Sequence, residues 1–109
     1  MRQAGVIAAA GVVALETMVD RLADDHVNAC RLADALQERW PGSVDASTVQ
    51  TNIVCAALDA LPHDLLARLD HERVRAGLLD ARTVRFVTHK DVDDHDIARV
   101  VKVLDTLVA

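Results

Sequence analysis

Aromatic residues are almost absent from this sequence of 109 residues, which has no tyrosine, one phenylalanine, Phe86, and one tryptophan, Trp40. Alanine, valine and leucine supply most of the 51% hydrophobic content, so the core must be aliphatic. The formal net charge is -5, and the cationic residues are scattered along the chain. Since the sequence offers neither a basic stripe nor aromatic platforms on which bases stack, it excludes a nucleic-acid partner.

Cysteine is also scarce. Cys30 and Cys55 lie far apart, without the Cys-x-x-Cys spacing of a redox or zinc motif. This usage is typical of a reducing, cytoplasmic setting in which both thiols are small core residues. The five histidines contain no pair at i,i+4 spacing on which a metal site could be built. The aspartates from Asp91 onward resemble a calcium loop, but Lys102 replaces its bidentate glutamate, so we expect a helix cap and no metal.

No hydrophobic run is long enough to cross a bilayer, because the longest, residues 6–15, is followed at once by Glu16. With Arg2 before it, this run also resembles a signal peptide. The apolar three-and-four spacing, however, continues past any cleavage point to residue 40. We therefore expect a long helix here and no membrane partner.

This first helix is expected over residues 4–39, ending at Trp40-Pro41-Gly42. Its first half is apolar all round and is expected to be buried on every side, whereas its second half is amphipathic. We expect a single domain over residues 1–109, in which residues 1–40 form the helix and residues 41–109 a small α+β unit.

Three strands and two further helices follow in the pattern. A strand over residues 51–57, apolar at consecutive positions, is expected to be central and covered on both faces. A short helix opens at residues 61–64. Strands over residues 74–79 and 83–88 have a hairpin-length separation, and Asp93 caps the last helix. The predicted fold class is α+β, with helices on one face of a small, mostly antiparallel sheet.

Arg85 is the residue in these strands that most needs an explanation. Alternation places Val84, Phe86 and Thr88 on one face, toward the helices, and Arg85 with Val87 on the other. A guanidinium presents five donors in a rigid fork suited to bidentate binding of a carboxylate. The alternative is a surface arginine paired with one of the many aspartates.

Four blocks of the sequence stand out in this order. They are Met1-Arg2-Gln3-Ala4-Gly5-Val6-Ile7-Ala8-Ala9-Ala10-Gly11, then Asp24-Asp25-His26 with Asn28-Ala29, then Gln50-Thr51-Asn52-Ile53-Val54, and finally Val84-Arg85-Phe86-Val87-Thr88-His89 with Asp91-Val92. Together they resemble the C-terminal third of the low-specificity L-threonine aldolases. The resemblance is colinear and runs from end to end, which makes it far more specific than any single block.

This resemblance implies that the chain is the C-terminal small domain of a fold-type I enzyme dependent on pyridoxal phosphate (PLP). It implies cleavage of 3-hydroxy-amino acids such as threonine and allo-threonine to glycine and acetaldehyde, with the cofactor acting as an electron sink. Arg85 matches the arginine that binds the substrate α-carboxylate. Arg2 matches an arginine that contacts the cofactor phosphate, near a helix N-terminus. The family also implies a homo-oligomer when the enzyme is complete.

The chain departs from the family pattern in one respect. The phosphate loop, the residue that stacks on the cofactor ring and the lysine that attaches the cofactor lie upstream in the family, and Met1 coincides with an internal methionine. The sequence has two lysines, Lys90 and Lys102, and both are expected to lie at the surface. We therefore expect no catalytic residue in this chain, an N-terminal PLP-binding part as its partner, and no activity of the chain alone.

Two further expectations concern the remaining residues. Of the histidines, His26 is expected to pack on the apolar side of the first helix, His63, His71 and His95 to be exposed, and His89 to approach the face of Arg85. A different class of function also stays open: a non-catalytic α+β module that binds a small molecule or a partner. Residues from Thr51 onward are one strand short of a ferredoxin-like unit.

Overall fold

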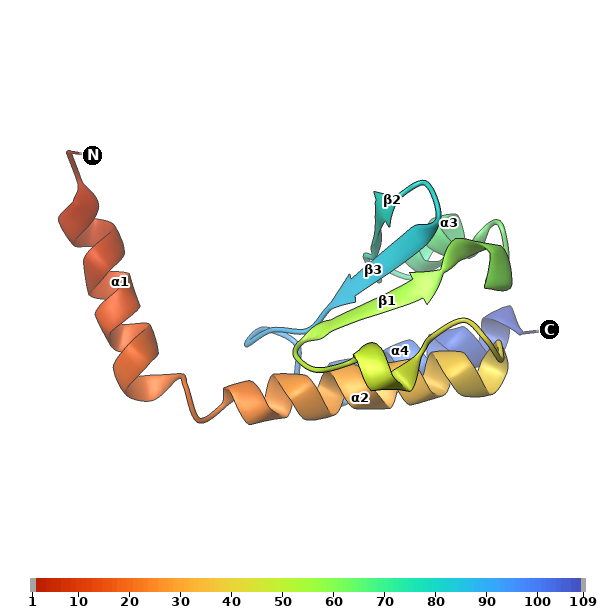
Figure 1. Cartoon of the computed structure of the whole chain (residues 1–109), viewed down its shortest axis with the longest axis horizontal. Helices are drawn as coiled ribbons and strands as arrows, with labels where there is room; N and C mark the ends of the chain where they lie inside the picture. Colours follow the sequence, from red (N-terminus) through yellow and green to blue (C-terminus); the bar gives the residue numbers. More distant parts are fainter. Residues whose placement is uncertain (1, 109) are drawn as a thin grey trace.

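The computed structural model describes residues 2–108, which form four α-helices, two 3-10 turns and a three-stranded antiparallel sheet. Helices α2 and α4 contact one another beneath the sheet, and α1 projects away from them (Figure 1). The predicted α+β class is confirmed. The elements in chain order are α1 (Ala4–Thr17), α2 (Leu22–Arg39), η1 (Ala46–Thr48), β1 (Ile53–Ala57), η2 (Leu58–Ala60), α3 (Leu65–His71), β2 (Gly77–Asp80), β3 (Thr83–Val87) and α4 (Asp94–Leu107).

The prediction of one unbroken first helix is wrong. Helix α1 ends at Thr17 and α2 begins at Leu22, with a sharp change of direction between them (Figure 1). In the turn, the backbone N–H of Leu22 donates to the carbonyl of Val19 at 3.1 Å. The buried face of α2 starts only at Asp25, and residues 19–24 are exposed apart from half-buried Arg21, so little packing holds α1 and α2 on a common axis.

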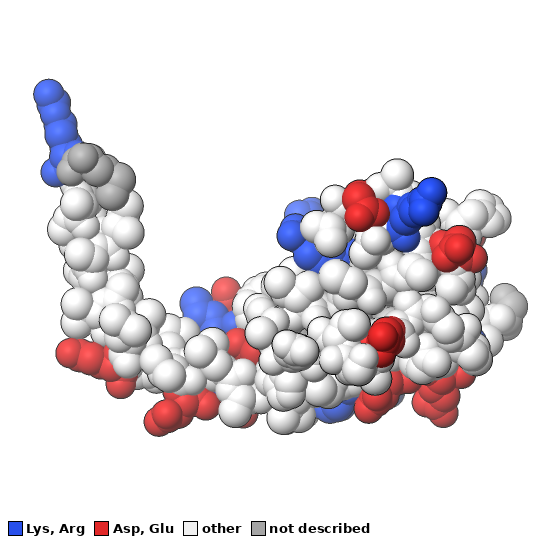
Figure 2. Space-filling model, viewed as in Figure 1, with Lys and Arg blue, Asp and Glu red and all other residues white. Residues whose placement is uncertain are grey.

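The first helical turns, expected to be buried on every side, are exposed within residues 2–108. No residue of α1 is buried, and Val6 and Leu15 are 72% and 76% exposed. A helix that is apolar all round has no preferred face, and the helix-covered face of the sheet is already occupied by α2 and α4. Figure 2 shows α1 as a nearly uncharged arm beside a body that carries most of the charged side chains.

The sheet has the strand order β1-β3-β2, with both pairs antiparallel. Strand β3 is therefore central and β1 lies at an edge, which corrects the prediction that the first strand is central and covered on both faces. Within β1, Val54 and Ala56 are buried, whereas Cys55 and Ala57 are half-buried and Ile53 is exposed. A single layer of helices covers one face only, so the consecutive apolar residues of β1 meet two different environments.

The predicted hairpin is confirmed, although β2 is shorter than expected. The loop between β2 and β3 is closed by Asp80, whose Oδ1 accepts a hydrogen bond from the backbone N–H of Arg82 at 2.8 Å. This bond, with a second from the Thr83 side chain, lowers the pKa of Asp80. An irregularity in the pairing after Leu78 shortens the regular part of β2, all of whose residues are exposed.

The core lies between the sheet and helices α2 and α4. Leu36 and Leu104 face Val54, Val84 and the only phenylalanine in an almost wholly aliphatic interior, as the composition predicts. The predicted N-cap of α4 is present as a capping box in which Asp93 and Asp96 each accept from the other's backbone N–H, at 2.9 and 3.0 Å. Within residues 2–108, no helix combines the length and hydrophobicity that a membrane span requires.

Candidate functional site

Arg85 lies in the middle of the central strand on the face that no helix covers. Its neighbours Val84, Phe86 and Thr88 are buried, whereas Arg85 and Val87 are exposed. The alternation predicted from the sequence is therefore confirmed. We refer to this uncovered side of the sheet, formed by Ile53, Cys55, Ala57, Gly77, Arg85 and Val87, as the open face.

Within residues 2–108, the guanidinium of Arg85 on the open face has no counter-charge. Its cross-strand neighbours are Cys55 on β1 and Gly77 on β2, so one flank carries a small side chain and the other none. A Cβ placed on Gly77 would meet nothing within 4 Å. No ion pair between residues 2 and 108 includes Arg85, so the alternative of an aspartate partner is not what the structure holds.

A buried set of hydrogen bonds holds the end of this strand in place. The Thr88 hydroxyl donates to the backbone carbonyl of Asp25 on α2 at 2.7 Å. Its backbone N–H donates to the carbonyl of Asn52 at 2.9 Å, and the Asn52 amide returns a bond to the Thr88 carbonyl at 2.7 Å. These three residues, which we call the clasp, tie β3, the start of β1 and α2 together three residues from Arg85.

Sequence reasoning missed the clasp as a unit. Its members lie in three of the four blocks that carry the family resemblance, which was the available signal. Asp25 is buried and its carboxylate pairs with Arg21 at 2.5 Å. Asn28, one turn further along α2, is 2% exposed, and its Oδ1 has no hydrogen-bond partner in the described part of the chain.

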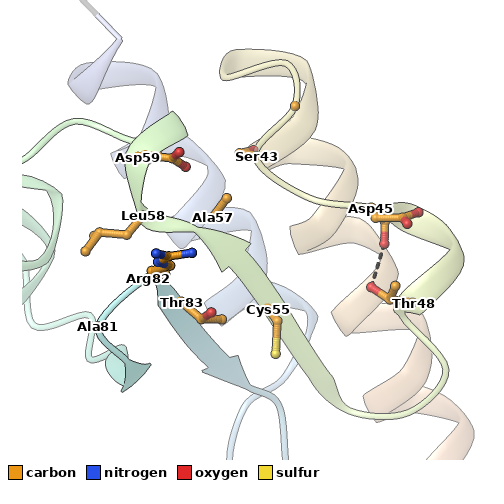
Figure 3. Close-up of a pocket in the computed structure, with 11 residues that line it drawn as sticks. Ser43, Asp45, Thr48, Cys55, Ala57, Leu58, Asp59, Ala81, Arg82 and Thr83 are labelled. Atoms are coloured by element: carbon orange, nitrogen blue, oxygen red, sulfur yellow. Dashed lines mark hydrogen bonds between the residues drawn. The ribbon is translucent and has the colours of Figure 1, made fainter.

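A shallow cavity of about 680 Å³ adjoins the open face where β1 ends and β3 begins. Figure 3 shows Cys55, Thr83 and Arg82 around it, with Asp59 in η2 at the end of β1 and Asp45 just before η1. Hydrogen bonds from the Ser47 hydroxyl and backbone N–H lower the pKa of Asp45. Its lining combines apolar side chains such as Ala57 and Leu58 with charges of both signs. Arg85 lies next to it, because Cys55, which lines the cavity, is the cross-strand neighbour of Arg85.

The residues present do not by themselves form a site for a cofactor that needs an attached lysine. Lys90 is exposed and its ammonium lies 2.9 Å from Asp91, which lowers the pKa of that carboxyl. Lys102 is exposed on α4. Arg2 is exposed just before α1, and α1 projects away from the sheet (Figure 1), so these residues do not bring Arg2 near Arg85.

The histidines divide as follows. His63, His71 and His95 are exposed, as predicted. His26 is exposed, which corrects the expectation that it packs on the apolar side of the helix. The buried face of α2 includes Asp25, Ala29 and Leu32 instead. His89 is exposed, and its Nδ1 accepts from the backbone N–H of Asp91 at 3.2 Å. No group of three or more potential metal ligands occurs in residues 2–108.

Comparison with known proteins assigns the chain to a class. The family described as "Beta-eliminating lyase" matches residues 1–60, and the chain belongs to that family. It is 36% identical over 101 residues to the low specificity L-threonine aldolase of Escherichia coli strain K12, covering 92% of the chain and 29% of that protein. It is 30% identical over 111 residues to the probable low-specificity L-threonine aldolase 2 of Arabidopsis thaliana, covering 98% of the chain and 31% of that protein. The chain thus spans less than a third of the length of these relatives.

Proposed function

We propose that this chain is the small-domain part of a PLP-dependent lyase that cleaves threonine-like 3-hydroxy-amino acids to glycine and an aldehyde. In this proposal, Arg85 binds the α-carboxylate of the substrate. The observation that carries it is the position of Arg85, central in the sheet, on the open face and without a counter-charge in the described chain. The likeness to threonine aldolases supports the same conclusion.

The chemistry of the guanidinium fits this task. A carboxylate accepts two parallel N–H bonds from an arginine fork, which fixes both its position and its orientation. Because Gly77 adds no side chain beside Arg85, an amino acid can approach the strand closely. Holding the carboxylate orients the bond between Cα and Cβ relative to the groups that break it.

The cofactor, when bound, supplies the electron sink for this cleavage, and the lysine that attaches it must come from polypeptide outside these residues. Arg2 is proposed to contact its phosphate. That role is supported by the position of Arg2 just before α1, since a helix N-terminus favours an anion. The uncharged, exposed surface of α1 is the surface we expect the rest of the enzyme to cover.

Further parts of the proposal follow from the family. The complete enzyme is expected to be a cytoplasmic homo-oligomer. The 109-residue chain by itself is expected not to release aldehyde from threonine, because neither of its lysines lies in a site that could attach the cofactor. Purified chain with PLP and threonine, assayed for acetaldehyde, tests this directly.

The decisive experiment places this chain in the context of a full-length relative. In the E. coli relative, the matching segment of 101 residues is replaced by this chain, and cofactor uptake is verified by its absorbance before kinetics are measured. Replacing Arg85 by Met should lower kcat/KM for threonine about 100-fold, and by Lys about 10-fold, mainly through KM, because a charge-assisted bond to the carboxylate is lost.

The matched control is Arg31→Met, since Arg31 lies on α2, on the helix-covered side of the sheet, and its side chain is 42% exposed. It should leave kcat/KM within about twofold of the unmodified chimera. A chimera that binds cofactor and cleaves threonine equally well with Met at position 85 would contradict the carboxylate role. One that binds cofactor without cleaving threonine would contradict the substrate assignment.

A further inference from the structure

A thiol and an imidazole are paired on helix α2, outside the open face. Cys30 and His26 are one helical turn apart, and the Cys30 Sγ lies 3.7 Å from the His26 Nε2. On the other side of the ring, His26 Nδ1 lies 3.2 Å from the backbone carbonyl oxygen of Thr51. Helix α2 packs on the covered side of the sheet, so this pair is separate from Arg85.

The carbonyl of Thr51 determines which ring nitrogen carries the proton. A carbonyl oxygen can only accept a hydrogen bond, so neutral His26 must hold its proton at Nδ1. The lone pair of Nε2 then faces Cys30, and the thiol is the donor in that contact. A nucleophile next to a base that a third group orients is the arrangement by which proteins activate a thiol.

The charged residues near this pair lie on α2 rather than on the segment packed against it. The segment that contacts α2 here, residues 46–52, contains no charged residue. On α2 itself, Arg31 lies near Asp94 at 3.9 Å, and the carboxylate of Asp25 is bound by Arg21. Asp34 lies one turn beyond Cys30 on α2 and is exposed.

We propose that Cys30 is a modification site, a thiol activated by His26 that reacts with small uncharged carbon electrophiles. In the reaction, the thiol proton passes to Nε2 of His26. The sulfur then forms a bond to the carbon, and the leaving group departs with its electron pair. The negative charge of Asp34 and the nearby acidic residues disfavours anionic reagents.

Cys55 provides an internal standard within the same molecule. Both thiols are free and half-buried, but no histidine lies within hydrogen-bonding distance of Cys55 in the described chain. Iodoacetamide is the probe, used on the 109-residue chain, with alkylation of each cysteine followed by mass spectrometry of its peptide. At a pH of about 6.5, Cys30 should react at least about 10-fold faster than Cys55.

The variant His26→Gln removes the base while keeping a side chain suited to a helix. It should slow alkylation of Cys30 about 10-fold and leave Cys55 unchanged. The control His63→Gln alters an exposed histidine away from either thiol and should leave both rates unchanged. A Cys30 rate that is equal in the His26→Gln variant and the unmodified chain would overturn the proposal.

A measurement on the unmodified chain keeps the test independent of how the variant folds. An ordinary thiol, with a pKa of about 8.5, loses alkylation rate about tenfold for each pH unit below that value. Between pH values of about 8 and 6.5, the ratio of the Cys30 rate to the Cys55 rate should rise as the pH falls. A Cys30 profile that coincides with that of Cys55 would also overturn the proposal.

Discussion

Helix α1 and the body formed by residues 22–107 are both rich in small aliphatic residues, but they bury them to opposite extents. In α1, no residue is buried, whereas Leu36, Val54 and Leu104 in the body are fully inaccessible. Helices α2 and α4 each carry a polar face opposite their apolar one, so they can cover the sheet and still meet water. Helix α1 has no such division. Hydrophobic content alone therefore does not place a segment in a core.

The largest effect should come from truncating a leucine in each region. Leu104→Ala removes a buried side chain from the layer between α4 and the sheet and should lower the free energy of unfolding by about 3 kcal/mol. Leu15→Ala on α1, where the side chain is 76% exposed, should change it by less than about 0.5 kcal/mol. Urea unfolding followed by circular dichroism measures both. Equal losses would mean that α1 packs on the body in solution.

A hydroxyl in each region gives a second matched pair. Thr88 and Thr17 both donate to a backbone carbonyl at 2.7 Å, but the Thr88 bond is buried in the clasp and the Thr17 bond is exposed on α1. Thr88→Val should cost about 2 kcal/mol, because the carbonyl of Asp25 loses a buried donor. Thr17→Val should cost almost nothing. If the two variants unfold at the same urea concentration, the clasp does not hold β3.

A charge on α1 should change surface behaviour more than stability. Ile7 is 61% exposed on a nearly uncharged helix, so Ile7→Glu should reduce binding of a hydrophobic dye and self-association seen by sedimentation. Its effect on the free energy of unfolding should stay below about 0.5 kcal/mol. The control Asp20→Glu, at an exposed acidic position, should change neither readout. Unchanged dye binding with Glu at position 7 would show that α1 is not the exposed apolar surface.

The smallest effect should come from the cap of α4. The backbone N–H of Asp96 lowers the pKa of Asp93, so the folded state binds the Asp93 proton less tightly than the unfolded chain does. The stabilisation is therefore present above a pH of about 4 and is lost as the pH falls through the lowered pKa. Asp93→Asn keeps a capping oxygen without the charge and should flatten this acid dependence. Urea midpoints at pH values of about 6 and 3 measure it, with Asp34→Asn as the charge-matched control.

Several features were predictable because they depend on neighbouring residues. The aspartates at the start of α4 predict its cap, the two-residue period of β3 predicts the exposure of Arg85, and the turn residues between β2 and β3 predict the hairpin. The position of β1 was not predictable in this way. Its run of apolar residues indicated cover on both faces, yet Cys55 and Ala57 are small enough to lie half-buried on an open face.

The clasp could not be predicted from spacing, because 63 residues separate Asp25 from Thr88. From the sequence, a threonine at the end of a strand indicates only β-structure. Its hydroxyl gains a buried partner because α2 packs against the end of the strand. The break between α1 and α2 has the same origin. The periodicity continues through residues 18–21, but the packing that would keep one axis begins only at Asp25.

By itself, the sequence determined the aliphatic character of the core, the class of the fold, the side of β3 on which Arg85 lies and the family to which the chain belongs. These follow from composition, from periods of two and 3.6 residues, and from motifs read in order. The tertiary structure decided which strand is central, where the first helix breaks, and which polar groups meet at the clasp and at Cys30. Such features arise from contacts between segments that are distant in the sequence. The free energy of each contact depends on which residues pack together in the folded chain.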